Sequence, residues 1–330
     1  MSLIHVITVT TTPRRSSCQI YHNTPALVFS AGGYTGNIFH DFNDGIIPLF
    51  ITIETLFNGR DVTLVVANFT DWWYSKYEIL LSQLTSHRVI NLHNQTATHC
   101  FPSAAVGLVS HGPMTVDPTL LPSRKTFLDF RALLGAAYDN CHVPPPPPLK
   151  GIPRLVFVSR AGPTGRVILN QDDVVRAAEE VGFDVVVFRP NKFTWLCDAY
   201  KLIDGSHAVF GVHGAAMTHA LFLRPGAVFV QVVPLGNEWL AETYFKKVAV
   251  EGMKFEYLEY KVRAAESSLV EKYGKDGAMI VEAREIASKN WTALDTVYLK
   301  GQDVRLDVER IRVYLRIAYL KARRFMEENG

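Results

Sequence analysis

Short, nearly all-apolar runs alternate with longer amphipathic segments along most of the chain. The apolar runs are five to seven residues long and predict buried β-strands at residues 26–30, 61–67, 88–92, 154–160, 184–190, 208–212 and 227–233. The segments between them predict helices at residues 40–57, 76–85, 127–138, 171–181, 194–204 and 303–328. Such alternation is typical of parallel sheets covered on both faces by helices. The pattern therefore predicts an α/β protein with two doubly wound, Rossmann-type domains and a long C-terminal helix.

Local signals refine two of these helices. Gly45 and Pro48 lie inside the segment 40–57 and are expected to interrupt or kink its helix. Asn170 is a suitable N-cap for the helix at 171–181, and Gly182 is expected to end it.

A run of five prolines marks the clearest boundary in the chain. It lies within CHVPPPPPLKGIPR, residues 141–154, and favours an extended polyproline II segment without helix or central strand. We expect an N-terminal α/β domain over residues 1–143, a proline-rich linker over 144–153, a second α/β domain over 154–302 and a C-terminal helix over 303–330.

The composition narrows the class of protein. Hydrophobic residues make up 48% of the 330 residues and charged residues 20%, with a formal net charge of +2, as in an ordinary globular protein. Nucleic-acid binding normally requires a strong basic bias, so no nucleic-acid partner is expected. No apolar run approaches the ~18 residues that a membrane-spanning helix needs, so we expect no membrane segment in this chain.

Cysteines and sequons bear on the cellular compartment. The four cysteines, Cys18, Cys100, Cys141 and Cys197, form no CxxC pair, which argues against a structural zinc site. They could form two disulfides, with three possible pairings, or remain buried thiols. N-glycosylation sequons begin at Asn68, Asn94 and Asn290 and would accept glycans in the secretory pathway.

Glycines and a histidine follow the predicted strand at 208–212. Gly211, His213, Gly214, Ala215 and Ala216 lie where that strand gives way to a helix. Ligands bind beyond the carboxyl ends of parallel strands, and the N-terminus of the next helix offers N–H groups to a diphosphate. The stretch lacks the GxGxxG pattern, which favours a single nucleotide over a dinucleotide. The alternative is a tight turn with His213 hydrogen-bonded in the core.

Three further residues could complete that nucleotide site. Ser159 and Arg160 close the first strand of the second domain, where an arginine can bind an anion with two donors. Glu242 follows the last predicted strand and could accept hydrogen bonds from a ribose. A surface ion pair for Arg160 and a solvated Glu242 are the alternatives.

A second polar cluster follows the first predicted strand. Asn37, His40 and Asp44 have the spacing i, i+3 and i+7, which places them on one face of a helix. A carboxylate beside an imidazole fixes its tautomer, so we interpret His40 as a general base oriented by Asp44. Two alternatives are that Asp44 is itself the base and that the pair is structural. Tyr34 and Gly36 fit a loop that approaches a ligand.

Aromatic residues Trp72, Trp73 and Tyr74 follow in the same domain. They could stack on a sugar ring or pack in the core.

Six stretches together resemble the plant branch of glycosyltransferase family 61. They are VFSAGGYTGNIFHDFNDGIIPLFIT, CFPSAAVGLVSHGPMTVDP, LVFVSRAG, VFGVHGAAMTHALFLRPGAVFVQVVPLGNEWLAETYF, AAESSLVEKYGKD and YLKGQDVRLDVERIR. They occur in the family's order from Cys18 to about Tyr319. The combination of GNIFHDFND with GVHGAAMTH is the most specific part. The family's N-x-x-H-x-x-x-D element matches Asn37, His40 and Asp44.

The resemblance implies a mechanism and a setting. It implies an inverting, metal-independent transferase of the GT-B architecture, in which two domains face a cleft and the terminal helix returns to the first domain. The expected reaction moves arabinofuranose or xylose from a UDP-sugar to xylan during cell-wall synthesis in the Golgi lumen. The family's G-x-H-G-A element matches residues 211–215, and its strand-end Ser-Arg matches Ser159 and Arg160.

The start of the chain departs from the family pattern. Family members carry a cytoplasmic tail, a membrane anchor and a stem, whereas this chain begins roughly where the catalytic domain does, so we expect an N-terminal domain shortened at its start. A non-catalytic sugar- or nucleotide-binding remnant of the fold is the alternative function. A dehydrogenase is disfavoured because no GxGxxG follows a predicted strand.

Overall fold

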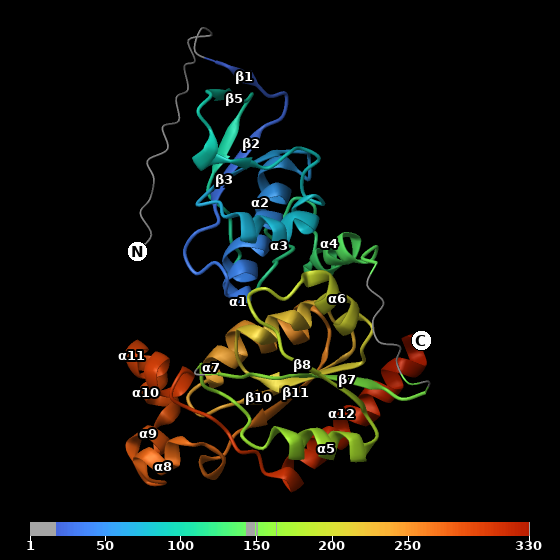
Figure 1. Ribbon diagram of the computed structural model, residues 1–330, viewed down its shortest axis with the longest axis vertical. Helices are drawn as coiled ribbons and strands as arrows, with labels where there is room; N and C mark the ends of the chain where they lie inside the picture. The colour runs from blue at the N-terminus through green and yellow to red at the C-terminus, as the bar shows by residue number, and fades with distance from the viewer. Residues whose placement is uncertain (1–17, 143–148, 150, 163, 330) are drawn as a thin grey trace. The chain divides into compact units, whose positions relative to one another are not determined.

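The computed structural model describes residues 18–142, 149, 151–162 and 164–329 (Figure 1). The chain divides between Asn140 and Cys141 into two compact units. The proline run at 144–148 lies outside the described residues. Each unit contains a parallel β-sheet, which confirms the predicted α/β class.

The sheet of the first unit has four parallel strands. Their order is β4 (Ile90–Asn91), β3 (Thr63–Ala67), β2 (Ala26–Ser30) and β6 (Ala104–Val106). The two central strands, β2 and β3, are apolar and almost wholly buried, because helices cover both faces of such a sheet. The order along the sheet reverses between β2 and β6.

One long helical stretch follows β2. It comprises α1 (Ile38–His40), a π-helical segment (Asp41–Ile46) and α2 (Ile47–Phe57). The α-helix is interrupted, as expected, by the π-helical segment that contains Gly45, and the chain stays helical into α2. A kink at Pro48 stays a prediction. Pro48 lies in the first turn of α2, where a missing N–H costs no hydrogen bond of that helix.

The remaining elements of the first unit complete its layers. They are α3 (Asp71–Leu81), α4 (Phe127–Tyr138) and a two-stranded pairing of β1 (Ile20–Tyr21) with β5 (His99–Cys100). Helix α3 begins five residues before the predicted start, so it contains the three aromatics at 72–74. A disulfide joins Cys18 to Cys100 beside the β1–β5 pair.

The second unit has a five-stranded parallel sheet. Its order is β11 (Glu256–Lys261), β10 (Val228–Val233), β9 (Ala208–Val212), β7 (Arg154–Val158) and β8 (Asp184–Phe188). Helices α5 (Gln171–Val181) and α12 (Val308–Asn329) pack together on one face (Figure 1). Helix α6 (Leu196–Asp204) and a 3-10 helix (Ala215–Phe222) cover the other face. The order reverses between β7 and β9.

Short helices after β10 and β11 form a second apolar cluster in this unit. They are α7 (Glu238–Ala241), α8 (Leu269–Tyr273), α9 (Ala278–Val281), α10 (Ala283–Lys289) and α11 (Trp291–Ala293). A second disulfide joins Cys141 to Cys197 on α6. Both disulfides therefore lie within single units, and the described residues include no free cysteine.

Two sequence-based expectations about helix ends fail for the same reason. The terminal helix begins at Val308 rather than Asp303, because Val304 forms isolated bridges with Ile168 and Ser267. Asn170 precedes α5 without capping it. Its side chain instead bonds the backbone N–H and C=O of Leu306. In both cases a residue that local sequence rules assign to a helix or a helix cap instead makes contacts with a distant part of the chain. The expected return of the terminal helix to the first unit stays a prediction.

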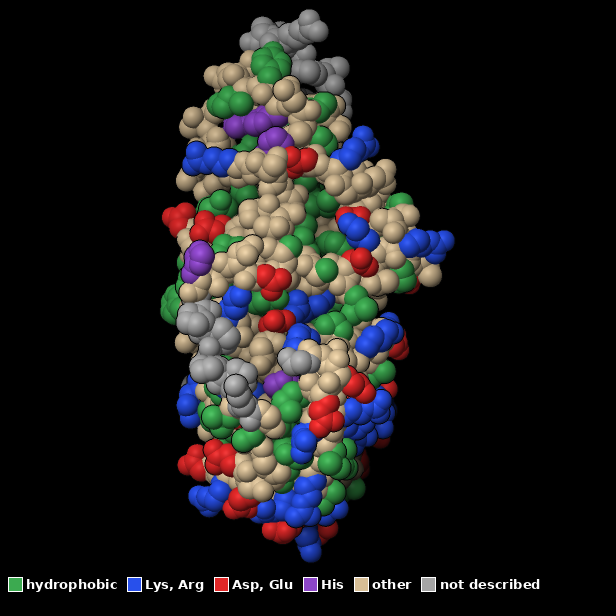
Figure 2. Space-filling model, turned by 90° about the vertical axis from the view of Figure 1, so that its right-hand side faces the viewer, with side chains coloured by type: hydrophobic (Ala, Val, Ile, Leu, Met, Phe, Trp, Pro, Cys, Tyr) green, Lys and Arg blue, Asp and Glu red, His purple; other side chains and the backbone are tan. Residues whose placement is uncertain are grey.

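No helix of the described ranges is long and apolar enough to cross a membrane. On the face shown in Figure 2, Lys and Arg side chains are interspersed with Asp and Glu. That face therefore presents no continuous surface of one charge.

Candidate functional site

The β7–β9 reversal of the second sheet brings two predicted motifs together. Val158 at the end of β7 pairs with Gly211 of β9, so the residues that follow both strands emerge side by side. In open α/β sheets, ligands bind at such a reversal, beyond the carboxyl ends of the strands. Arg160 follows β7 there, and His213 with Gly214 follows β9.

Two arginines converge on Gly214. A Cβ atom at this position would lie 2.5 Å from Nη1 of Arg160 and 3.1 Å from Nη1 of Arg166. The φ angle of Gly214 is +151°, a conformation that other residues rarely adopt. Glycine is required here because its bare Cα leaves space for both guanidinium groups. We call Arg160, Arg166, His213 and Gly214 the arginine site.

Neither arginine of the arginine site forms an ion pair with a carboxylate among the described residues, although the charges of Asp303 and Asp295 act on Arg160 and Arg166 respectively. Burial, followed by the charge of Arg160, lowers the pKa of Arg166 to about 9, and Nε of Arg166 is buried without a hydrogen-bond partner. Burial also lowers the pKa of Arg160. Two desolvated cations, one of which has an unused donor, are the arrangement that an anion would stabilise.

Burial keeps His213 neutral beside the arginines, and a chain of hydrogen bonds orients its ring. Its Nδ1 lies 2.8 Å from Nε2 of Gln231, whose Oε1 accepts from the hydroxyl of Tyr257 at 2.8 Å. Burial, then Arg166 and Arg160, lowers the pKa of His213 well below its usual value. The network assigns Gln231 as donor to Nδ1, so the ring proton is on Nε2.

Arg166 is a residue of this site that the sequence interpretation missed. It lies in the loop between β7 and α5, at a φ angle of +61°, and its Nη1 donates to the carbonyl of His213 at 3.3 Å. The sequence signal was the second arginine of SRAGPTGR, six residues after the first. Only the folded loop returns that arginine to Gly214.

The other residues expected at the nucleotide site have different environments. Ser159 is buried, and its hydroxyl donates to Oε1 of Gln171 at 2.5 Å. Gly211 allows close packing, because a Cβ there would lie 2.5 Å from the sulfur of Met217. Ala215 and Ala216 begin the 3-10 helix rather than an α-helix. Glu242 is exposed and contributes to raising the pKa of Tyr257.

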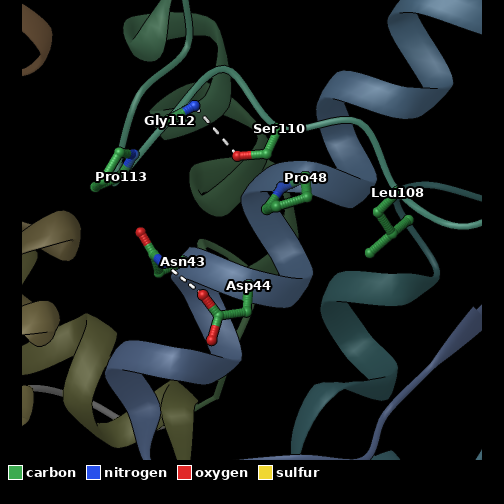
Figure 3. Close-up of a pocket in the computed structure, with 7 residues that line it drawn as sticks. All are labelled: Asn43, Asp44, Pro48, Leu108, Ser110, Gly112 and Pro113. Carbon is green, nitrogen blue, oxygen red and sulfur yellow. Dashed lines mark hydrogen bonds between the residues drawn. The ribbon is translucent and has the colours of Figure 1, made fainter.

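The β2–β6 reversal of the first sheet carries the second candidate site. A pocket of about 270 Å³ is lined by Asn43, Asp44, Pro48, Leu108, Ser110, Gly112 and Pro113. Figure 3 shows that the first three lie on the helical stretch after β2 and the rest on the chain after β6. We call this the carboxylate pocket.

Asp44 is the member of the predicted pair that lines the carboxylate pocket. Its Oδ2 lies 2.7 Å from Nδ1 of His40, one helical turn away. The ring of Tyr34 stacks on His40 with centroids 4.6 Å apart. The structure thus brings His40 and Asp44 together, as their one-turn spacing predicts, and adds a contact with Tyr34 that the sequence did not predict. Asn37 caps α1 by accepting from the N–H of Phe39.

Asp41 supports this pair, although the sequence did not single it out. Its carboxylate is 5% exposed, accepts from the hydroxyl of Tyr77 at 2.8 Å and accepts from the N–H of Gly36 at 3.1 Å. Burial raises the pKa of Asp41 above its usual value, although both hydrogen bonds oppose that shift. Asp41 therefore fixes the Tyr34–Gly36 loop beneath His40.

The three aromatics of α3 divide between core and surface. Trp73 is buried and packs edge-on against Phe29, whereas Trp72 is partly exposed and lies beside Gly36, where an added Cβ would be 3.3 Å from its ring. Of the three, Trp72 can still meet a sugar from the surface.

Two of the three sequon asparagines are exposed. These are Asn94 and Asn290. Asn68 is half-buried, and its side-chain amide donates to the hydroxyl of Ser30 at 3.0 Å. Glycan attachment at Asn68 would have to compete with that hydrogen bond.

No group of three or more His, Cys, Asp or Glu residues within the described ranges is arranged to hold a metal ion.

Comparison with known proteins places the chain in a family. The model of the family described as Glycosyltransferase 61 matches residues 38–230, more than half of the chain. Xylan glycosyltransferase MUCI21 of Arabidopsis thaliana is 40% identical over 93% of this chain and 64% of its own length. From Oryza sativa subsp. japonica, alpha-1,3-arabinosyltransferase XAT3 is 33% identical over 96% of this chain and 54% of its own length. Beta-1,2-xylosyltransferase XYXT1 of the same plant is 35% identical over 90% of this chain and 64% of its own length.

The chain thus spans between 54% and 64% of the length of these relatives. Among solved structures, the heptosyltransferase TibC of enterotoxigenic E. coli covers 74% of this chain and 64% of its own, with 11% identity and a TM-score of 0.36. That score is too low to support an argument about fold. The family model and the curated relatives agree, and they show that this chain belongs to glycosyltransferase family 61.

Proposed function

We propose that the protein is an inverting glycosyltransferase that moves a pentose, arabinofuranose or xylose, from a UDP-sugar to xylan. Family membership and the names of the plant relatives support the reaction class and the acceptor. The arginine site supports the diphosphate-linked donor.

The two buried arginines of the arginine site, which form no ion pair among the described residues, are the observation that carries the proposal. Arg160 and Arg166 both reach Gly214. A diphosphate would supply negative charge and accept from the orphan Nε of Arg166. The same donors would stabilise the charge that develops on UDP as it leaves.

The carboxylate pocket supplies the proton acceptor in this proposal. The acceptor hydroxyl oxygen attacks the anomeric carbon, and the bond from that carbon to the diphosphate oxygen breaks. UDP leaves with the electron pair, and the hydroxyl proton passes to the carboxylate of Asp44. We favour Asp44 over His40 as the base because Asp44 lines the pocket. His40 then holds the carboxylate from its Oδ2 side.

A metal ion has no part in this proposal, because the two guanidinium groups provide the charge that a divalent cation would otherwise supply to a diphosphate. Activity is expected to be unchanged after treatment with EDTA. Loss of activity with EDTA and its recovery with Mn²⁺ would contradict metal independence.

The secretory pathway, and the Golgi lumen within it, is the proposed location. Two disulfides and two exposed sequon asparagines support an oxidising, glycosylating compartment. Glycosidase treatment of the protein from plant cells should lower its apparent mass.

Titration with UDP tests the donor site directly. Arg160→Ala and Arg166→Ala each remove a charged hydrogen-bond donor, which should weaken UDP binding by roughly 1.5–3 kcal/mol, or about ten- to a hundredfold. Arg176→Ala is the matched control, since Arg176 is an exposed arginine of α5 that pairs only weakly with Asp173. Unchanged UDP affinity in both test variants would exclude the arginine site.

Turnover tests the rest of the proposal. The protein is incubated with UDP-xylose or UDP-arabinofuranose and xylo-oligosaccharides, and the products are weighed by mass spectrometry. A product heavier by one pentose supports the reaction. UDP binding without any product would favour a non-catalytic nucleotide-binding protein of the same family.

A further inference from the structure

Asn43 joins the two walls of the carboxylate pocket. Its Nδ2 donates to Oδ1 of Asp44 at 2.5 Å, the bond drawn in Figure 3. Its Oδ1 accepts from the backbone N–H of Met114 at 2.8 Å. One amide group therefore contacts the carboxylate on the helical wall and the loop that forms the opposite wall.

The loop wall is attached to the helical stretch at two points. Met114 N–H donates to Asn43, and Val109 N–H donates to Oγ1 of Thr52 at 2.7 Å. Thr52 lies on α2 and is fully buried. Between the two attachments lie the pocket-lining residues Ser110, Gly112 and Pro113.

The backbone conformation of Met114 indicates that its hydrogen bond to Asn43 helps to fix the loop. Met114 is 2% exposed and has a φ angle of +45°. The left-handed region of φ is unfavourable for a residue with a side chain. Such a conformation persists only where surrounding contacts fix it. The hydrogen bond from Met114 to Asn43 is a contact of this kind, because it is made by the strained residue itself.

We propose that Asn43 is a positioning residue that couples the orientation of the Asp44 carboxylate to the placement of the loop that binds the acceptor saccharide. This inference rests on the proposed function. The lining combines polar side chains, Asn43, Asp44 and Ser110, with apolar ones, Pro48, Leu108 and Pro113, a mixture that suits a sugar ring with its polar hydroxyls and apolar face. Asn43 keeps the helical wall and the loop wall in register.

The chemistry of an amide explains why asparagine serves here. Asparagine donates through Nδ2 and accepts through Oδ1. An ionised aspartate at the same position would still accept from Met114 but could no longer donate to Asp44. It would place a second negative charge against that carboxylate. The two functions of Asn43 can therefore be separated by substitution.

Three variants separate the two contacts. Asn43→Asp keeps the loop attachment and disturbs the carboxylate. Thr52→Val removes the other loop attachment and leaves the Asn43–Asp44 bond in place. Asn43→Ala removes both contacts of Asn43. Each is compared with the unaltered chain by amide hydrogen exchange at residues 109–114 and by the pH profile, kcat and KM for xylo-oligosaccharides.

Each variant has its own expected pattern. Asn43→Asp should keep the protection of the Met114 amide and move the acid limb of the kcat/KM profile to higher pH, because the second carboxylate opposes ionisation of the first. Thr52→Val should raise KM without moving that limb. Asn43→Ala should speed exchange at Met114 about tenfold, as expected for one lost hydrogen bond. It should also lower kcat/KM about ten- to a hundredfold.

Two results would overturn the proposal. One is an unchanged exchange rate at Met114 in Asn43→Ala, which would show that the amide does not hold the loop. The other is an Asn43→Asp profile identical to that of the unaltered chain. The exchange measurement needs no turnover, so it decides the loop attachment even if the proposed reaction fails. UDP titration of the same samples should give one affinity throughout, because the arginine site is in the other unit.

Discussion

The two sheet reversals of this protein carry opposite kinds of polar site. At the arginine site, two desolvated cations lie together with a neutral histidine, and no carboxylate among the described residues forms an ion pair with them, although Asp303 and Asp295 act on them electrostatically. In the carboxylate pocket, every charged group has a partner. Asp44 contacts both His40 and Asn43. The two cations of the first site form no ion pair with a described residue, whereas the carboxylate of the second site is paired and exposed to solvent.

This difference in charge pairing indicates which kind of ligand suits each site. Unpaired buried charge is costly in a protein without its ligand, so it persists where a ligand of opposite charge supplies compensation. A paired, accessible carboxylate costs little and remains able to accept a proton. The first arrangement suits a diphosphate, and the second suits proton transfer from a sugar hydroxyl.

The largest expected effect tests the chemistry of the carboxylate pocket. Asp44→Asn should lower kcat by about 10²–10⁴, the usual contribution of a positioned base. UDP affinity should not change, because the proposed nucleotide site is in the other unit. His40→Ala should cost less if the imidazole only orients the carboxylate. The reverse order, with His40→Ala the weaker enzyme, would make His40 the base, and normal turnover in both would make the pair structural.

The second prediction tests whether the arginine site stores unfavourable charge. Arg166→Met removes a buried cation that forms no ion pair in the described part of the chain and puts an apolar side chain in its place. Without UDP, we expect the variant to be more stable by about 1–3 kcal/mol, measured as an increase in the free energy of unfolding in urea. With saturating UDP, this advantage should shrink or reverse. Arg176→Met is the surface control. A less stable Arg166→Met protein without UDP would indicate that the cation is already balanced.

The third prediction uses a second buried histidine of the same unit. Burial, then Arg224 and Arg154, lowers the pKa of His207 to about 4. Because the unfolded chain binds the proton near pH 6.5, stability is full above that pH and is lost as the pH falls toward 4. The loss at pH 5 should be about 2 kcal/mol relative to pH 7. Urea unfolding of His207→Gln should show a smaller loss, and an equal loss would assign the pH dependence to other groups.

The smallest expected effect has the opposite sign and belongs to the first unit. The raised pKa of Asp41 means that the folded chain holds its proton more tightly than the unfolded chain. Its contribution to stability should therefore fall as the pH rises from the ordinary value near 3.8 through the raised value. Asp41→Asn keeps an acceptor for Gly36 and removes the ionisation. The free energy of unfolding of this variant, measured between pH 4 and 7, should then fall less steeply with pH than that of the unaltered chain. An equally steep fall would contradict the assignment to Asp41.

Local pattern was enough to predict much of the fold. The strands at 26–30 and 208–212 and the helices at 127–138 and 171–181 have the predicted bounds, because continuous apolar runs and helical periodicity act within a few residues. The one-turn spacing of His40 and Asp44 likewise determined their contact. The family followed from the order of six local motifs.

The tertiary structure decided the features that join distant parts of the chain. The disulfide pairings, the return of Arg166 to Gly214 and the attachment of Met114 to Asn43 each depend on loops whose paths the local sequence does not specify. The start of α12 moved to Val308 for the same reason, since the bridges of Val304 outweigh its helical periodicity. Local sequence sets backbone preferences of less than about 1 kcal/mol per residue, and long-range hydrogen bonds and burial exceed them wherever the chain folds back on itself.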